Sequence, residues 1–304
     1  MAFAPAVITN FFEIGYGSSP VPIGATGGGY ILSKGTTSRV SIVEDGRGGI
    51  FTTVNGDRNF DARTTRRAVN LFLSGTGCKP CTVRVEQSVR TPIGSGFGAS
   101  GAAATSAVYA TARAAGMTSS KRRLALFAHR AEILEQTGLG TVSVIFDEIG
   151  AGAISVPGEP GEANFVKVRA PTDLRIVTAF LAPFDKRAAL SSKAVSERIN
   201  KLGHESLRSF LADPTLDTLA KEGERFSRSL GLESTEVKKL IDAAKAAGAS
   251  YASQNMIGYS MHSLTDADGC RKVVAALRRF GREVRVDTFE IGRRRAGPYV
   301  PSRR

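Results

Sequence analysis

The sequence predicts a protein of the α+β class with two domains. Its 304 residues are enough for two domains of ordinary size. Strand-like segments fill most of the first 60 residues, and the later strand patterns are separated by groups of amphipathic helices. A segment with two prolines and two glycines, at 157–164, divides the two parts. We therefore expect one domain at 1–160, a second at 161–292, and a basic tail at 293–304.

The first domain begins with strands. The segment 39–56 predicts two strands around a glycine-rich turn, because strand-forming residues flank a run of glycine and charged residues. The glycine cluster "GATGGGY" at 24–30 lies between strand signals and is expected to be a loop or a tight bend. The other elements expected here are a helix at 61–75, a strand at 81–89, helices at 101–115 and 119–140, and strands at 142–146 and 152–156.

The second domain combines strands with several helices. Its order is strand, strand, helices, strand, helix, strand, which suits an antiparallel sheet covered by helices. The expected elements are strands at 165–170 and 174–182, three helices across 185–247, one strand at 253–264 with Gly258 inside it, a helix at 267–281 and a closing strand at 282–292.

The composition excludes several classes of function. The net charge is +13, and five arginines lie in the last twelve residues, which contain no acidic residue. The absence of Trp, an aromatic content of 7% and the lack of a recognisable reader motif argue against a nucleic acid partner. The tail is expected to be solvated and disordered. No apolar run approaches the roughly 20 residues of a membrane helix, and no signal peptide is recognisable, so a cytoplasmic protein is expected.

The stretch "RTPIGSGFGASGAAATSAVYATA", residues 90–112, carries the main functional signal. A strand, a glycine-rich loop and an alanine-rich helix follow one another, an order that exposes backbone N–H groups at the positive end of a helix. This order predicts a phosphate cradle. It is not a Walker loop, because the terminal Gly-Lys-Ser/Thr is absent, and Gly96, Gly98 and Gly101 match the dinucleotide pattern only weakly.

The same stretch resembles a known kinase motif. The pattern P-x-x-x-G-F-G-A-S-G-A at 92–102 is similar to the phosphate loop of the GHMP kinases, which include galactokinase, homoserine kinase and the mevalonate kinases. The segments "APAVITNFFEI" at 4–14, "AHRAEILEQTGLG" at 128–140 and "SQNMIGYSMHSL" at 253–264 resemble segments of the archaeal pantoate kinase branch. Four similar segments in the same order are more specific than a single glycine loop.

The resemblance implies both a fold and an activity. The fold would be a two-domain GHMP kinase fold, with an N-terminal domain of the ribosomal S5 domain 2 type and a ferredoxin-like C-terminal domain. The activity would be ATP-dependent phosphorylation of pantoate to 4-phosphopantoate in archaeal coenzyme A biosynthesis. Two alternatives stay open: a kinase for another small hydroxy acid, and a catalytically silent relative that binds nucleic acid through its basic surface. A homodimer is also left open.

The resemblance assigns the ATP site to the loop and to one carboxylate. Ser100, at the second serine position of the motif, would bind Mg²⁺ and phosphate, although a serine there is also an ordinary helix N-cap. Glu132 would hold Mg²⁺, which prefers one or two carboxylates together with phosphate. Glu132 lies beside the apolar face expected for the helix at 119–140. That face includes Leu134, and the helix is expected to end at Gly138. The expected ATP-binding residues are Pro92, Gly94, Ser95, Gly96, Gly98, Ala99 and Ser100.

The acceptor site is less well marked. A carboxylate substrate requires a cation or amide donors, and the candidates are Thr26, His129, Lys186 and Arg187. Thr141 stands where many relatives carry an aspartate that acts as a base toward the acceptor hydroxyl. A threonine does not take up a proton at neutral pH, so catalysis here would depend on positioning and charge stabilisation. The catalytic candidates are therefore Ser100, Glu132 and Thr141.

Overall fold

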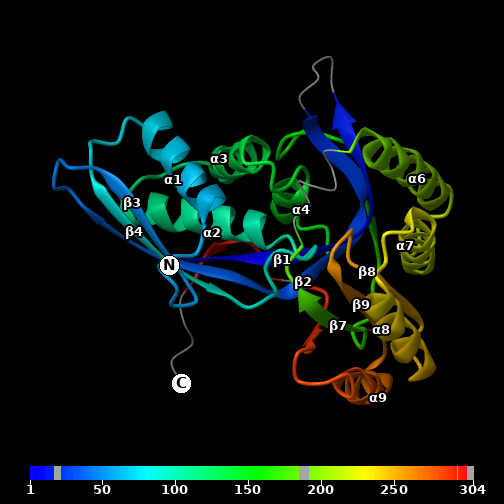
Figure 1. Ribbon diagram of the computed structural model, residues 1–304. Coiled ribbons are helices and arrows are strands. Elements are labelled where there is room, and N and C mark those ends of the chain that lie inside the picture. The colour runs from blue at the N-terminus through cyan, green and yellow to red at the C-terminus, as the bar shows by residue number, and fades with distance from the viewer. Residues whose placement is uncertain (17–21, 185–191, 293, 300–304) are drawn as a thin grey trace.

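The computed structural model describes residues 1–16, 22–184, 192–292 and 294–299. Two α+β halves lie side by side, as the sequence predicted (Figure 1). The N-terminal half contains β1 (Ala2–Tyr16), β2 (Pro22–Val43), β3 (Gly49–Val54), α1 (Arg63–Gly75), β4 (Thr82–Val89), α2 (Ala99–Ala114), α3 (Lys121–Leu134), α4 (Thr141–Asp147), β5 (Ala151–Val156) and β6 (Asn164–Val168). The C-terminal half contains β7 (Arg175–Ala182), α6 (Lys193–Ala212), α7 (Leu216–Leu230), α8 (Thr235–Ala246), β8 (Tyr251–Gln254), β9 (Tyr259–Thr265), α9 (Ala267–Arg278), β10 (Arg285–Phe289) and β11 (Gly297–Pro298).

The first sheet is built around the long strand β2. This strand pairs in antiparallel fashion with β1 along most of its length, with β4 near its C-terminal end and with β5 at its glycine-rich part. The strand order is β11-β1-β2-β4-β3, and β6 extends the sheet beyond β5. Helices α1, α2 and α3 gather on one face of this sheet (Figure 1). The other face of β4 is exposed, so its side chains alternate between buried and exposed positions.

The second sheet has the ferredoxin-like arrangement that the resemblance implied. Its strand order is β10-β7-β9-β8, and every neighbouring pair is antiparallel. Along the chain the order is β7, helices, β8, β9, α9 and β10, which is the β-α-β-β-α-β pattern of that fold. Helices α8 and α9 pack on this sheet, α6 packs against β1, and α7 contacts both β1 and β8. The C-terminal half therefore covers part of the first sheet as well.

One hydrophobic core joins the two halves. Phe11 and Phe12 of β1 contact Phe210 of α6 and Phe226 of α7, with ring centroids 6.5 and 5.7 Å apart. All four rings are at most 4% exposed. Burying a side chain of this size contributes about 1.5 to 3 kcal/mol, so the contact couples the two halves strongly. The division into domains at residue 160 stays a prediction, but β6 lies beyond it and still pairs with β5 of the first sheet.

Two of the expected elements take a different form because of close backbone contacts. The cluster 24–30 is not a loop but part of β2, paired with β1 and β5. A Cβ atom on Gly29 would lie 2.0 Å from the carbonyl oxygen of Ile8, so glycine allows the two strands to approach at a register shift. The segment 253–264 is not one strand but the hairpin of β8 and β9, which turns at residues 255–258.

Two further predictions, one of a strand and one of a helix end, also need correction. The β-branched segment 142–146 was expected to be a strand but forms α4, because Val142 and Ile145 are buried on one face at helical spacing. Helix α3 ends at Leu134 and not at Gly138, and the side chain of Leu134 is 60% exposed instead of buried. Tertiary packing overrides the local pattern in both places.

The tail is not disordered over residues 294–299, contrary to the prediction. β11 pairs with the start of β1, and the red end of the ribbon runs beside blue β1 in Figure 1. The amide of Tyr299 donates a hydrogen bond to the carbonyl oxygen of Met1 at 3.1 Å. The guanidinium of Arg294 lies over the rings of Phe3 and Tyr299, 4.4 and 4.3 Å from their centroids. Cation–π contacts and strand pairing explain why this basic segment is ordered.

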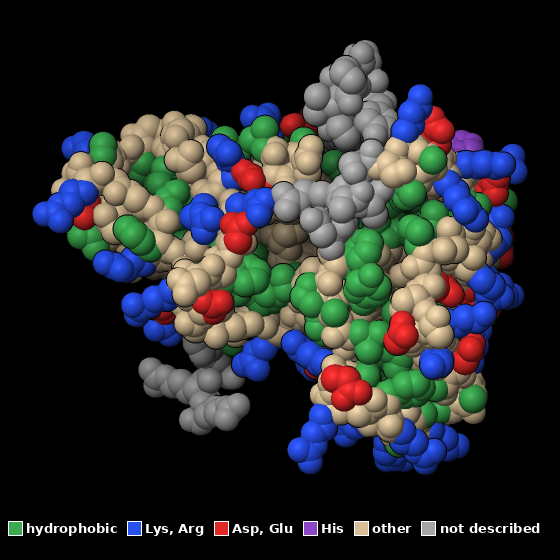
Figure 2. Space-filling model, in the orientation of Figure 1, with side chains coloured by type: hydrophobic (Ala, Val, Ile, Leu, Met, Phe, Trp, Pro, Cys, Tyr) green, Lys and Arg blue, Asp and Glu red, His purple; other side chains and the backbone are tan. Residues whose placement is uncertain are grey.

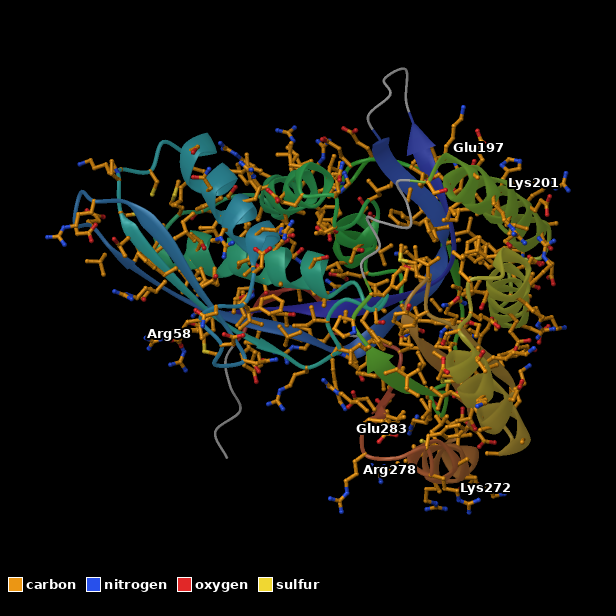
Figure 3. The ribbon with its side chains drawn as sticks, in the orientation of Figure 1. Arg58, Glu197, Lys201, Lys272, Arg278 and Glu283 are labelled. Atoms are coloured by element: carbon orange, nitrogen blue, oxygen red, sulfur yellow. The ribbon has the colours of Figure 1, made fainter. Side chains whose placement is uncertain are left out.

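The positive charge is spread over the surface. Figure 2 shows lysine and arginine side chains scattered over both halves. Apolar side chains gather near the centre of the same face. The charged side chains labelled in Figure 3, among them Arg58, Lys201 and Lys272, are exposed at the periphery of the molecule. In the part of the chain that the structure describes, no helix is both long enough and apolar enough to cross a membrane.

Candidate active site

Residues 94–98 form a loop between β4 and α2, here named the glycine loop. Gly94, Gly96 and Gly98 have φ angles of 82°, 80° and 57°, in the left-handed region that favours glycine. Gly98 is the N-cap of α2, a helix of 16 residues without an acidic side chain in its first turn. The loop therefore lies at the positive end of the helix dipole, as expected of an anion-binding site.

The glycine loop is held by hydrogen bonds from outside it. Three of its carbonyl groups accept a bond from distant parts of the chain, one from the segment just after β7, one from β9 and one from β1, and the carbonyl of Gly98 accepts from Ala102 N in α2 at 3.1 Å. The pairs are Phe184 N to Gly94 O at 2.7 Å, Ser260 Oγ to Ser95 O at 2.7 Å and Val7 N to Phe97 O at 3.1 Å. Within the described residues, the amides of Ser95, Gly96 and Gly98 donate no hydrogen bond. The carbonyls are thus used by the protein, and the amides are left for a ligand.

Ser100 and Glu132 meet beside the first turn of α2. The hydroxyl of Ser100 donates a hydrogen bond to Glu132 Oε1 at 2.7 Å, and Glu132 is only 1% exposed. A Cβ atom on Gly101 would lie 2.8 Å from Oε2, and one on Gly138 would lie 2.6 Å from Oε1, so these glycines make room for the carboxylate. Ser100 is not the N-cap of α2, because Gly98 takes that position. The structure brings together the two predicted metal ligands.

Two cavities border the glycine loop, and the surface between the two halves is hollowed (Figure 2). The large cavity has about 500 Å³ and is lined mainly by β1, β2 and the segment after α3. The loop cavity has about 250 Å³ and is lined by residues 93–100 and the start of α1. Gly96, Gly98, Gln136 and Thr137 line both cavities. Ligands in the two cavities would meet at these residues.

The large cavity is apolar and carries no charge on its described lining. Among the described residues around it there is no Asp, Glu, Lys, Arg or His. Thr26 lines it, as expected, and its Oγ1 donates a hydrogen bond to Glu13 Oε2 at 3.3 Å. Thr141 lines it too, and its Cγ2 lies 2.8 Å from the position that a Cβ on Gly98 or Gly101 would take. Thr141 therefore packs its methyl group against the first turn of α2.

Of the remaining side-chain candidates, two line neither cavity, one uses its hydroxyl elsewhere, and two lie outside the described part of the chain. His129 is completely buried with its neighbours on α3, and it lines neither cavity, so its predicted contact with substrate has no support in the geometry. Pro92 is buried and lines neither cavity. The hydroxyl of Ser95 donates to the carbonyl oxygen of Ala182 at 3.2 Å, so it faces the C-terminal half. Lys186 and Arg187 lie outside the described residues.

The sequence interpretation missed the segment that follows α3. Gln136 has a φ of 53°, which is uncommon for a residue other than glycine, and it lines both cavities together with Thr137. The hydroxyls of Thr137 and Thr64 lie 3.0 Å apart, within hydrogen-bonding distance, and join this segment to the start of α1. The available signal was the pattern "EQTGLG", because polar residues before a glycine turn are typical of a bend beside a site.

Comparison with known proteins agrees with this geometry. The family profile described as "GHMP kinases N terminal domain" matches residues 63–146. A pantoate kinase of Methanospirillum hungatei is 25% identical over 302 residues, which cover 98% of this chain and 95% of that protein. A pantoate kinase of Thermococcus kodakarensis is 30% identical over 257 residues, which cover 79% of this chain and 80% of that protein.

The fold is found in solved structures as well. A protein described as a phosphotransferase related to the CoA biosynthesis pathway superposes with a TM-score of 0.83 at 24% identity, over 97% of this chain and 96% of that one. A homoserine kinase from Cytophaga hutchinsonii superposes with a TM-score of 0.66 at 17% identity, over 97% of this chain and 95% of that one. The extent of these similarities, together with the glycine loop and the Ser100–Glu132 pair, shows that the chain is a small-molecule kinase that belongs to the pantoate kinase branch of the GHMP kinases.

Proposed function

We propose that the protein transfers the γ-phosphoryl group of ATP to pantoate, forming 4-phosphopantoate and ADP in archaeal coenzyme A biosynthesis, in the cytoplasm. The observation that carries the proposal is the position of the glycine loop, which borders both cavities at Gly96 and Gly98. ATP in the loop cavity would place its terminal phosphate at this junction, and the acceptor would approach from the large cavity. Positioning and charge stabilisation then supply most of the catalysis of phosphoryl transfer.

The large cavity suits the carbon skeleton of pantoate. Pantoate carries two methyl groups on the carbon next to its terminal CH₂OH, and these prefer an apolar surrounding. Phe11, Phe12, Ile14 and Leu139 offer such surfaces around the large cavity. Gln136 and the backbone of the glycine-rich part of β2 are among the polar groups available to the hydroxyl and carboxylate oxygens, and Thr26, whose proton is given to Glu13, can accept a bond from a substrate hydroxyl. The apolar lining supports an acceptor with a branched hydrocarbon centre.

The donor set supports Mg²⁺ as the metal. Ser100 and Glu132 present one hydroxyl and one carboxylate 2.7 Å apart, both hard oxygen ligands. Mg²⁺ in kinases is bound by one or two carboxylates together with substrate phosphates and waters, so two protein ligands are sufficient. When bound, the ion would neutralise charge on the β- and γ-phosphates. The room that Gly101 and Gly138 leave around the carboxylate fits this role, because larger side chains would displace it.

The acceptor hydroxyl finds no carboxylate base on the described lining of the large cavity. Thr141 packs its methyl group against α2, and its hydroxyl is too weakly basic to take the proton. In a loose transition state the acceptor proton is lost late, so early removal by a base is not required. We infer that Gly96, Gly98, Ser100 and Glu132 carry the catalysis, and that the proton leaves to the transferred phosphate or to water.

The test is ADP release with saturating Mg-ATP and a panel of acceptors: pantoate, mevalonate, phosphomevalonate and homoserine. We expect turnover with pantoate and a kcat/KM at least ten times lower with each of the others. A preference for another acceptor would assign the chain to a different hydroxy acid. This outcome is included because the described lining of the large cavity offers no cation to the carboxylate of pantoate. No turnover with any acceptor would favour the silent relative. Size-exclusion chromatography tests the homodimer, which stays a prediction.

A further inference from the structure

Three side chains of the C-terminal half form a buried chain of hydrogen bonds that ends on the glycine loop. His262 Nδ1 lies 2.7 Å from Asn255 Oδ1, and Asn255 Nδ2 donates to Ser260 Oγ at 2.9 Å. Ser260 Oγ in turn donates to the carbonyl oxygen of Ser95 at 2.7 Å. The four residues are at most 3% exposed. We name the side chains of His262, Asn255 and Ser260 the relay.

The relay has a single consistent direction. The carbonyl oxygen of Ser95 only accepts, so Ser260 must use its one proton there and accept from Asn255 Nδ2. The amide oxygen of Asn255 then accepts from His262, whose proton is thereby assigned to Nδ1. Burial lowers the pKa of His262 to about 3, so the ring is neutral at physiological pH and carries that one proton. Each of the three relay bonds therefore has one donor and one acceptor.

The last bond of the relay sets the direction of one amide of the glycine loop. In a planar trans peptide the C=O of Ser95 and the N–H of Gly96 point in opposite directions. Because Ser260 holds the Ser95 oxygen on the side of the C-terminal half, the Gly96 N–H faces the other way. Gly96 lines both cavities, and its amide donates no hydrogen bond within the described residues. The amide is thus available at the junction of the two cavities.

Close packing makes this arrangement stiff. A Cβ atom on Gly96 would lie 2.8 Å from the carbonyl oxygen of Asn255, and one on Gly258 would lie 2.7 Å from Ser95 Oγ. The hairpin turn at 255–258 therefore fits directly onto the glycine loop, without space for either to shift. A hydrogen bond between backbone groups, from Met256 N to the carbonyl oxygen of Thr9 at 3.1 Å, also holds this turn on β1.

We propose that the relay is a positioning device that aims the Gly96 N–H at the phosphate to be transferred. The proposal rests on the proposed kinase function, because it requires a nucleotide phosphate at the glycine loop. None of the three side chains lines either cavity, so they would act through the carbonyl of Ser95. Loss of the relay should therefore weaken nucleotide binding and slow phosphoryl transfer, while binding of the acceptor in the large cavity is unaffected.

The experiment compares Ser260→Ala with a matched control, Ser263→Ala. Both serines lie on β9, both are completely buried, and both donate to a backbone carbonyl oxygen, but Ser263 bonds Val177 O within the second sheet at 3.1 Å. Affinity for Mg²⁺ and a non-hydrolysable ATP analogue is measured by calorimetry, and the KM for ATP and for pantoate by steady-state kinetics. We expect Ser260→Ala to weaken analogue binding roughly 3- to 10-fold, the effect of one lost hydrogen bond, with an unchanged pantoate KM. Ser263→Ala should bind the analogue like the wild type.

Each outcome supports or overturns the relay. Equal analogue affinity in the two variants would overturn it while leaving the kinase function intact, and a wild type that does not bind the analogue would overturn the kinase function as well. If Ser260→Ala does not fold, Asn255→Asp replaces it, because an aspartate of the same shape competes with Ser95 for the Ser260 proton. That variant should weaken analogue binding as Ser260→Ala does, whereas Ser260→Thr, which keeps the hydroxyl, should bind the analogue like the wild type. An unchanged analogue affinity in Asn255→Asp would refute the proposal.

Discussion

Replacing Glu132 by Gln is the most direct test of the metal site. The variant keeps the shape of the side chain and an oxygen that accepts the Ser100 hydroxyl, but it removes the negative charge. A hydrogen bond to a charged group contributes about 1.5 to 3 kcal/mol to stability, and one between neutral groups about 0.5 to 1.5 kcal/mol. The weaker bond to Ser100 should therefore lower the free energy of unfolding by roughly 1 kcal/mol. Glu132 is only 1% exposed, so removing its charge also relieves a desolvation penalty. We therefore expect little change in Tm.

Activity should respond very differently. Removing one preorganised group that stabilises transition-state charge typically costs about 3 to 4 kcal/mol, or 10²- to 10³-fold in kcat. The assay is ADP release with pantoate across a Mg²⁺ titration, in which Glu132→Gln should need more Mg²⁺ and still reach a kcat at least 100-fold lower. Glu135→Gln is the control, because Glu135 pairs with Arg67 at 2.8 Å and lies three residues along the chain. A kcat for Glu132→Gln within threefold of that control would refute the assignment of this carboxylate to the metal.

Four further predictions follow from the structure. Gly98→Val should weaken ATP-analogue binding in calorimetry at least tenfold, because its φ of 57° and the Thr141 methyl 2.8 Å from the new Cβ oppose a side chain there; wild-type affinity would contradict the cradle. Thr141→Ala should reduce kcat less than tenfold, and Thr141→Asp should raise kcat if a base assists the acceptor hydroxyl. An effect of Thr141→Ala as large as that of Glu132→Gln would show that Thr141 itself takes part in catalysis. Removal of residues 293–304 should lower Tm, because β11 and its contacts with β1 are lost; an unchanged Tm would show that this pairing adds no stability. Burial lowers the pKa of His262 from 6.5 to about 3, so between these pH values the unfolded state binds more protons than the folded state. The free energy of unfolding, measured in urea, should therefore decrease with falling pH by up to about 1.4 kcal/mol per pH unit. His262→Gln should show a smaller dependence of this free energy on pH.

The sequence was sufficient for the class of the fold and for the centre of the site. Periodicity identified α1 and β4 almost to the residue, because each has one buried face and its pattern is local. Composition identified α2, which is buried on all sides between Ala104 and Ala112 and therefore shows no amphipathic pattern. The glycine loop followed from composition and order alone, since only glycine takes three left-handed φ angles so close together. The pairing of Ser100 with Glu132 came from the resemblance and not from spacing, and the structure places the two side chains in contact.

The tertiary structure decided which residues surround that centre. Composition indicated a loop at 24–30, but pairing with β1 and β5 turns the cluster into a strand that forms a wall of the large cavity. Spacing on α3 left His129 next to Glu132, yet the packing of the helix buries the histidine away from both cavities. The arginine-rich tail looked disordered because its partners, Met1 and Phe3, lie almost 300 residues away in sequence.

The sequence by itself therefore determined the local elements, the glycine loop and the identity of the chemical groups at the site. Only the tertiary structure decided that a hairpin from the C-terminal half holds the Ser95 carbonyl, and that Gln136 and Thr137 border both cavities. The physical reason is the range of the interactions. Helix and turn signals arise between residues a few positions apart, whereas the bond from Ser260 to Ser95 spans 165 positions and forms only when two separate sheets pack together.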